Sequence, residues 1–292
     1  MQFLIYIIVY PLLWIVSRLP FRLLYMFSDL IFFVLFYIIK YRRKTVQNNL
    51  KLTLPNLSDI ERTRIEKEFY HHMCDMFLEM IKTLGITERQ MKQRFVFTNI
   101  EVVHEFEKKE KSIVLMCAHY ASWEWMIIMG KFINIKGLGI YKKIKNPYFD
   151  KLIRDIRSKF DATLIDTKST IKTVTSNQQN GIQGIYGFIS DQTPRPQKTH
   201  YWENFMGKIV PVHTGGEMLA KKLDMNVLYL KVEKIKRGHY QATFIPLAEN
   251  VQSIPDYEIT QAFLKEVEKQ IYEKPEYYFW THKRWKFMKK NK

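Results

Sequence analysis

The chain has 292 residues, 47% of them hydrophobic, so it can bury the core of one large domain or two small ones. Its formal net charge of +17 indicates an anionic partner, which can be nucleic acid, a membrane surface or a phosphorylated substrate. The two cysteines, Cys74 and Cys117, are too few for a disulfide framework or a structural zinc site, which favours a reducing compartment that faces the cytosol.

The N-terminus favours a membrane among these partners. Residues 1–17 carry no charged side chain, and the apolar run 23–39 is interrupted only by Asp29. Four bases follow at once, as expected where a membrane segment meets the cytoplasm: Lys40, Arg42, Arg43 and Lys44. No basic region precedes the apolar stretch and no small-residue cleavage site follows it, which argues against a signal peptide.

We therefore expect residues 1–40 to anchor the protein to a membrane. The anchor can be one tilted span or a shallow helical hairpin that turns near Arg18-Leu19-Pro20, because neither apolar half alone reaches the roughly 20 residues that a bilayer requires. The alternative is a buried helix in the core of a soluble protein.

Residues 41–292 contain no long linker, repeat or low-complexity tract, which predicts one domain. Helical periodicity extends from Ser58, a plausible cap, to Leu84, just before Gly85. The remaining predicted strands are 113–117, 139–141, 163–165, 184–190, 227–232 and 240–244, and the remaining predicted helices are 123–131, 147–160, 170–180, 215–223 and 257–272. This alternation predicts an α/β fold, a mixed β-sheet flanked by helices on both faces.

The end of strand 113–117 is the first candidate site. His119 follows the strand, and Glu124 lies five residues further on, so the two side chains can act as a general base and the group that orients it. Chance alone produces such a spacing roughly once in a chain of this composition. Its position favours a function, because Ser122 can cap a helix from Trp123 and active groups of α/β proteins gather at such corners. The alternative is a histidine that only packs.

The helix that begins at Asn146-Pro147 carries three bases on one face, Lys151, Arg154 and Arg157. Asp150 lies four residues before Arg154 and can pair with it, whereas Arg157 has only Asp161, beyond the expected helix end. Arg157 is therefore the better candidate to hold an anion or a developing oxyanion. The alternative is a solvated basic face.

Two further segments follow predicted strands or begin predicted helices. Asp191 closes strand 184–190 and opens a turn with Gln192, although Asp often begins turns for local reasons. Thr214 and Gly215 begin a segment with Gly216 and Glu217 that has the form of a capping box, and its glycines would let a ligand approach the helix amides.

The C-terminal segment 277–286 interleaves aromatic and basic residues. By itself it can bind single-stranded nucleic acid, lie at a membrane interface or pack against the domain. The sequence has no P-loop, dinucleotide fingerprint, metal-ligand cluster or Gly-x-Ser-x-Gly elbow, so we expect neither a cofactor nor a metal.

In this order and spacing, the segments resemble the bacterial lipid A biosynthesis acyltransferases, the lauroyl and myristoyl transferases within the lysophospholipid acyltransferase superfamily. The chain departs from the usual family pattern at Tyr120-Ala121 and Ser122, where Phe-Gly and Asn are common. The resemblance extends over nearly the whole chain, in the blocks Tyr41-Arg42-Arg43 to Asn49-Leu50, Ala118 to Glu124, Lys145 to Asp150 with Arg154 and Arg157, Asp191-Gln192 with Pro194, Phe205-Met206-Gly207, Thr214-Gly215 and Trp280 to Lys286.

The resemblance implies a membrane-bound enzyme at the cytoplasmic face of the inner membrane of a Gram-negative bacterium. It implies transfer of an acyl chain from a thioester on acyl carrier protein, or on CoA, to a hydroxyl of a phosphorylated lipid acceptor, a lipid A precursor. His119, Glu124, Arg157 and Asp191 would be catalytic, and Lys151, Arg154, Gln192, Thr214 and Gly215 would bind substrate. His119 would be the general base and Glu124 its supporting acid, with membrane lipids but no nucleic acid as partners.

Two alternatives remain open from the sequence. The same chemistry can serve another acceptor, such as a glycerophospholipid, an amino lipid or a glycolipid. A more distant alternative is a non-catalytic protein that binds membranes or nucleic acid, although such a protein has no use for a histidine and an acid at one strand end.

Overall fold

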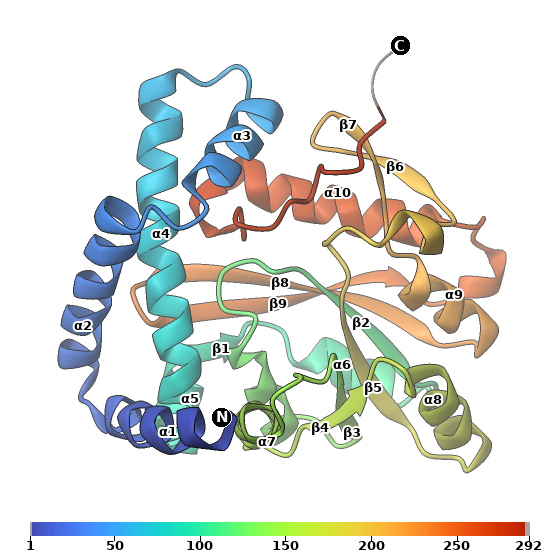
Figure 1. Ribbon diagram of the computed structural model, residues 1–292. Helices are drawn as coiled ribbons and strands as arrows, with labels where there is room; N and C mark the ends of the chain where they lie inside the picture. The colour runs from blue at the N-terminus through green and yellow to red at the C-terminus, as the bar shows by residue number, and fades with distance from the viewer. Residues whose placement is uncertain (1, 290–292) are drawn as a thin grey trace.

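The computed structural model describes residues 2–289. Met1 and residues 290–292, at the outer ends of the predicted segments 1–40 and 41–292, lie outside this part. A seven-stranded sheet forms the centre, in the order β1-β9-β8-β2-β5-β3-β4 (Figure 1). Its strands are β1 (Phe95–Phe97), β2 (Ile113–Cys117), β3 (Lys136–Tyr141), β4 (Thr163–Asp166), β5 (Gly184–Ile189), β8 (Asn226–Lys236) and β9 (His239–Ala248).

Helices flank this sheet, so the predicted class, a mixed α/β fold, is confirmed. A separate hairpin is formed by β6 (Trp202–Phe205) and β7 (Lys208–Pro211). The α-helices are α1 (Gln2–Arg18), α2 (Phe21–Phe33), α3 (Arg43–Thr53), α4 (Asp59–Lys82), α5 (Glu88–Arg94), α6 (Glu101–Glu107), α7 (Pro147–Arg157), α8 (Thr170–Gln179), α9 (Gly215–Lys222) and α10 (Glu258–Glu273).

The sheet brings the carboxyl ends of five strands to one edge. Strands β8, β2, β5, β3 and β4 are parallel, β1 is parallel to β9, and β8 and β9 form the one antiparallel pair among the described strands of this sheet. In the register of the central pair, Cys117 of β2 lies opposite Ile189 of β5, and the Ser190 amide donates to the Cys117 carbonyl at 3.1 Å. The residues that follow these strands therefore meet at the carboxyl edge, where α/β proteins place their sites.

Two helix starts follow the predicted capping chemistry. Ser58 and Glu61 form a reciprocal capping box at the start of α4. The Asn146 side chain accepts hydrogen bonds from the amides of Tyr148 and Phe149 at the start of α7, which ends at Arg157 rather than at Phe160.

Two other local predictions are wrong. No α-helix begins at Trp123; a 3₁₀ helix, η2 (Trp125–Lys131), follows β2, and the buried Ser122 hydroxyl has no hydrogen-bond partner in the described part of the chain. The segment 214–217 begins α9 but forms no capping box. Its Glu217 carboxylate instead accepts from the amides of Tyr257 and Thr260, at the start of α10.

The N-terminal residues form two helices that meet at Leu19-Pro20. The second helix, α2, continues into a π-helix, η1 (Val34–Ile38), and residues 21–38 are long and apolar enough to cross a membrane. Both helices pack on α4, and they meet as an L rather than folding back on each other as a hairpin (Figure 1).

Candidate active site

His119 and Asp191 form a hydrogen-bonded pair at the carboxyl edge of the sheet. Each residue lies two positions after a residue of the Cys117–Ile189 register pair, so the two parallel strands deliver them side by side. The imidazole Nδ1 lies 2.7 Å from Asp191 Oδ1, and the His119 amide donates to the same oxygen at 3.0 Å. The carboxylate is 1% exposed and the imidazole is 20% exposed, so the histidine remains open to a substrate.

The electrostatics keep Asp191 ionised. Burial on its own would raise the pKa of this carboxyl, but the charge and hydrogen bonds of His119 lower the pKa below its ordinary value. An anionic Asp191 accepts a hydrogen bond from Nδ1–H of the imidazole and leaves Nε2 available to accept a proton. The tautomer that this hydrogen bond favours is the one that a general base requires.

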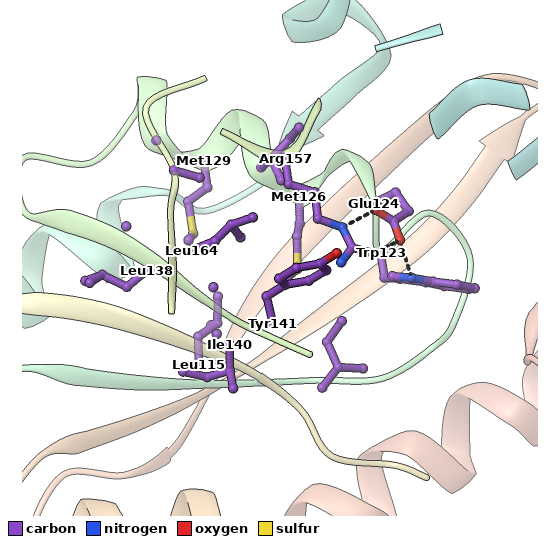
Figure 2. Close-up of a pocket in the computed structure, with 17 residues that line it drawn as sticks. Leu115, Trp123, Glu124, Met126, Met129, Leu138, Ile140, Tyr141, Arg157 and Leu164 are labelled. Carbon is purple, nitrogen blue, oxygen red and sulfur yellow. Dashed lines mark hydrogen bonds and ion pairs between the residues drawn. The ribbon is translucent and has the colours of Figure 1, made fainter. Parts of the chain in front are cut away.

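The expected contact between Glu124 and His119 is not formed. Glu124 instead forms a bidentate ion pair with Arg157, with distances of 2.9 Å from Nε to Oε2 and 2.5 Å from Nη2 to Oε1 (Figure 2). The Trp123 indole also donates to Glu124 Oε1 at 3.1 Å. Burial lowers the pKa of Arg157, but Glu124 more than offsets this, so the guanidinium is held in its charged form in one orientation.

This ion pair lies at a small apolar cavity of about 80 Å³. Glu124 and Arg157 are the only charged residues among the described residues that line it, and the guanidinium stacks over the Tyr141 ring at 5.3 Å. Figure 2 shows the apolar side chains around the same space. The lining comes from β2, η2, β3, β4 and β5, and includes Leu115, Met126, Met129, Leu138, Ile140 and Leu164.

A second, polar groove opens along the same edge. Gln192, Thr214 and Gly215, three residues predicted to bind substrate, line it. Gly215 borders open space, since a Cβ there would meet no atom within 4 Å. None of the described residues that line the groove is acidic, and its bases are Lys142, Lys168, Arg195, His200, His213 and His282.

Two residues that were predicted to bind substrate, Lys151 and Arg154, line neither the apolar cavity nor the polar groove. Lys151 is exposed and pairs with Asp155 on the surface of α7. Arg154 has no partner in Asp150, which accepts instead from the Tyr141 hydroxyl at 3.1 Å and the Ile144 amide at 2.7 Å. The expected Asp150–Arg154 pair is therefore wrong, and so is the expectation that Arg157 has only Asp161 as a carboxylate partner.

The C-terminal segment packs against the site, which decides among its three interpretations. The Phe279 ring stacks on His119 with centroids 6.2 Å apart, and the Phe279 amide donates to the His119 carbonyl. His282 Nε2 accepts from the Thr193 amide at 3.3 Å, next to Asp191. Trp280 and Arg284 are fully buried. No spacing rule in the sequence pointed to Phe279 or His282 as neighbours of His119.

The comparisons with known proteins agree over almost the whole chain. The family model described as "Bacterial lipid A biosynthesis acyltransferase" matches residues 1–287. The lipid A biosynthesis lauroyltransferase of Escherichia coli (strain K12) is 24% identical over 282 residues, 94% of this chain and 89% of the relative. Lipid A biosynthesis acyltransferase 2 of Shigella flexneri is 21% identical over 86% of this chain and 79% of its own length.

A histidine–carboxylate pair beside an apolar cavity, on a chain with these relatives, defines an acyltransferase. The chain belongs to the bacterial lipid A biosynthesis acyltransferase family. A role in lipid A biosynthesis points to a Gram-negative bacterium.

Proposed function

We propose that the protein transfers a fatty acyl chain from an acyl carrier protein thioester to a hydroxyl of a lipid A precursor. The observation that carries this proposal is the position of His119. Its ring contacts Trp123, which lines the apolar cavity, and its partner Asp191 directly precedes Gln192 and Thr193 of the polar groove. The base thus adjoins a space suited to an acyl chain and a space suited to a polar acceptor.

In the proposed mechanism, His119 Nε2 takes the proton of the acceptor hydroxyl as that oxygen attacks the thioester carbonyl. Asp191 holds the tautomer through Nδ1 and stabilises the imidazolium that forms. The tetrahedral intermediate then collapses, the carbon–sulfur bond breaks, and the imidazolium returns its proton to the thiolate. The supporting acid is therefore Asp191, in place of Glu124.

Glu124 serves this chemistry through Arg157 in the same proposal. The carboxylate uses the Nε and Nη2 protons of the guanidinium, and Nη1 has no hydrogen bond to a described residue. We assign Nη1 to the developing oxyanion, because a guanidinium that is already held in place needs no reorganisation during the reaction.

The groove suits the headgroup of the acceptor. The described residues that line it include three cationic side chains and three histidines but no acid. This pattern favours a phosphorylated sugar over a neutral glycolipid. The net charge of +17 also suits an acidic carrier protein as donor. Residues 1–40 would attach the domain 41–292 to the cytoplasmic face of the inner membrane, next to its lipid substrate.

The test is transfer of a labelled acyl group from acyl carrier protein, or from CoA, to a purified lipid A precursor. His119→Ala and Asp191→Asn should each lower turnover by about 10² to 10⁴, and the double variant should resemble His119→Ala, because the pair acts as a unit. Asp155→Asn, which removes a surface partner of Lys151, is the matched control.

If folded His119→Ala keeps its activity within about threefold of wild type, His119 is a packing residue and the mechanism is wrong. Mass spectrometry of lipid A from cells with and without the gene separates the acceptors. Unchanged lipid A together with a changed glycerophospholipid, amino lipid or glycolipid would assign the same chemistry to the other acceptor.

A further inference from the structure

The exposed apolar side chains of this protein are concentrated at its N-terminus. Of 27 large hydrophobic residues that are exposed in the described chain, 17 lie between Phe3 and Tyr41. On α2 they occupy the face turned away from the protein, including Leu23, Phe27 and Leu30, while Leu24 and Phe32 are buried on the opposite face. A continuous exposed apolar face of this kind marks an interaction surface.

The buried face of α2 is held to the domain by a charged cluster. Arg237, in the turn between β8 and β9, pairs with Asp29 of α2 at 2.5 Å and with Asp75 of α4 at 2.7 Å. The Ser28 hydroxyl donates to Asp75 at 2.7 Å, and His71 lies 2.9 Å from Asp29. These contacts fix the side of α2 against α4 rather than leaving it free in a bilayer.

The same contacts are incompatible with α2 as a membrane span. Residues 21–38 would extend about 27 Å at 1.5 Å per residue, close to the hydrocarbon thickness of about 30 Å, so Asp29 would lie near the middle of the bilayer. The α4 residues beside Phe32 are also charged, and Arg64, Lys67 and Glu68 would enter the hydrocarbon with it. A bilayer centre strongly disfavours such groups.

We propose that α1 and α2 lie in the plane of one membrane leaflet, as a monotopic platform whose exposed apolar face enters the lipid while its other face stays on the domain. This inference rests on the proposed function at a lipid surface and specifies how the protein attaches there. The occupant is the cytoplasmic leaflet with its anionic headgroups.

Charge complementarity supports this occupant. Exposed bases lie at the ends of the two helices, Arg18 and Arg22 at their junction and Lys40, Arg42 and Lys44 after η1, where in-plane helices meet headgroups. The other end of α1 contacts α7, with the Phe3 and Tyr148 rings 5.1 Å apart. The platform therefore extends from α4 to the helix that carries Arg157.

Cysteine accessibility in sealed membranes tests the orientation without an activity measurement. The native Cys74 and Cys117 are 3% and 2% exposed, so single cysteines can be added by Gln2→Cys, Arg22→Cys and, as the domain control, Asn250→Cys. Each full-length variant is treated with a membrane-impermeant maleimide in spheroplasts, in inverted vesicles and after solubilisation in SDS.

We expect all three positions to be protected in spheroplasts and labelled in inverted vesicles to a similar extent. Labelling of Arg22→Cys from the periplasmic side would overturn the proposal. In that case Gln2→Cys is also labelled from the periplasm if α2 alone spans the membrane, and it is protected if both α1 and α2 span it. Failure of Arg22→Cys to react on either side before SDS would also contradict it, since the proposal places the α1–α2 junction among the headgroups, within reach of the maleimide. Lipid A acylation can persist in each case, so the proposed function is judged separately.

Discussion

Glu124 and Arg157 depend on each other, so a substitution of one residue also changes the environment of the other. Glu124 is 8% exposed and Arg157 is 27% exposed, so removal of either partner leaves a partly desolvated charge without its counterion. Because the two residues line the cavity as a hydrogen-bonded pair, a loss of rate at one residue includes displacement of the other.

We expect Arg157→Ala to lower turnover on the order of a hundredfold or more, because one oxyanion-stabilising group is lost. Glu124→Gln should also be severe, since it frees the guanidinium to move, and the double variant should lose little more than Arg157→Ala. Arg154→Ala is the matched control on the same helix and should stay within about threefold of wild type. Thermal melting confirms that each variant is folded before acyl transfer is measured.

Equal and mild losses for Arg154→Ala and Arg157→Ala would contradict this prediction. In that case the ion pair holds α7 against η2, and the oxyanion is stabilised by another group.

At the residue scale, the sequence identified which side chains would be grouped but not which would touch. His119 could be predicted as a site residue because a buried strand ends just before it. Its pairing with Asp191, however, depends on the adjacency and register of β2 and β5, which are 72 residues apart in the sequence. The Glu124–Arg157 contact likewise depends on tertiary packing, since local i,i+4 rules pointed to Asp150 instead.

At the element scale, the junction of α1 and α2 is fixed by the end of α4. Lys82 donates from Nζ to the carbonyls of Ser17 at 2.8 Å and of Leu19 at 2.7 Å, which satisfies acceptors at the end of α1. Gly85, just after α4, allows this close approach because a Cβ there would lie 2.3 Å from the Ser17 oxygen.

We therefore expect Gly85→Ala to lower the free energy of unfolding by about 1–3 kcal/mol, since backbone must move to relieve the contact. Gly215→Ala is the control, because a Cβ at that glycine meets no atom within 4 Å and should change stability by less than about 0.5 kcal/mol. Denaturant unfolding in a mild detergent compares the two. Equal effects would show that the α1–α4 junction adjusts without cost.

Element types were readable from the sequence where a local rule determined them. Cap residues at Ser58 and Asn146 marked the starts of α4 and α7 correctly. Strand β1 and the hairpin β6–β7 were not predicted, because each has only three or four residues per strand and too little periodicity. The segment 214–217 resembled a capping box but uses Glu217 for a distant helix, a tertiary contact that no local pattern encodes.

At the scale of the whole molecule, histidines whose pKa is lowered in the folded chain make folding sensitive to mild acid. Burial lowers the pKa of His282 to about 4, with further lowering by His119, Arg284 and Arg42 against the opposite effect of Asp191. Burial is also the largest cause that lowers the pKa of His72 and of His213. Unfolding returns each imidazole to a pKa near 6.5.

The sign follows from proton binding. Between the folded and unfolded pKa values the unfolded chain binds more protons, so stability present above about pH 6.5 is lost as the pH falls toward 4. When Nε2 of His282 is protonated, it can no longer accept the hydrogen bond from the Thr193 amide. Acid therefore also removes a contact between two residues that line the polar groove. The buried Glu79 opposes this trend, because burial raises its pKa and its protonation favours the folded state as the pH falls.

We predict that the Tm of the wild type falls between pH 7.5 and pH 5, and that His282→Gln reduces this fall. The glutamine side chain can still accept a hydrogen bond from the Thr193 amide, but it does not titrate. The His282→Gln variant therefore keeps this contact and loses the dependence of stability on proton binding at this position. The contribution of Glu79 is common to both proteins and cancels in the comparison. His200→Gln, at an exposed groove position, controls for the substitution. The same Tm fall in wild type and His282→Gln would mean that His282 contributes no linkage and that the acid sensitivity arises at the other histidines with a lowered pKa, His72, His213 and His239.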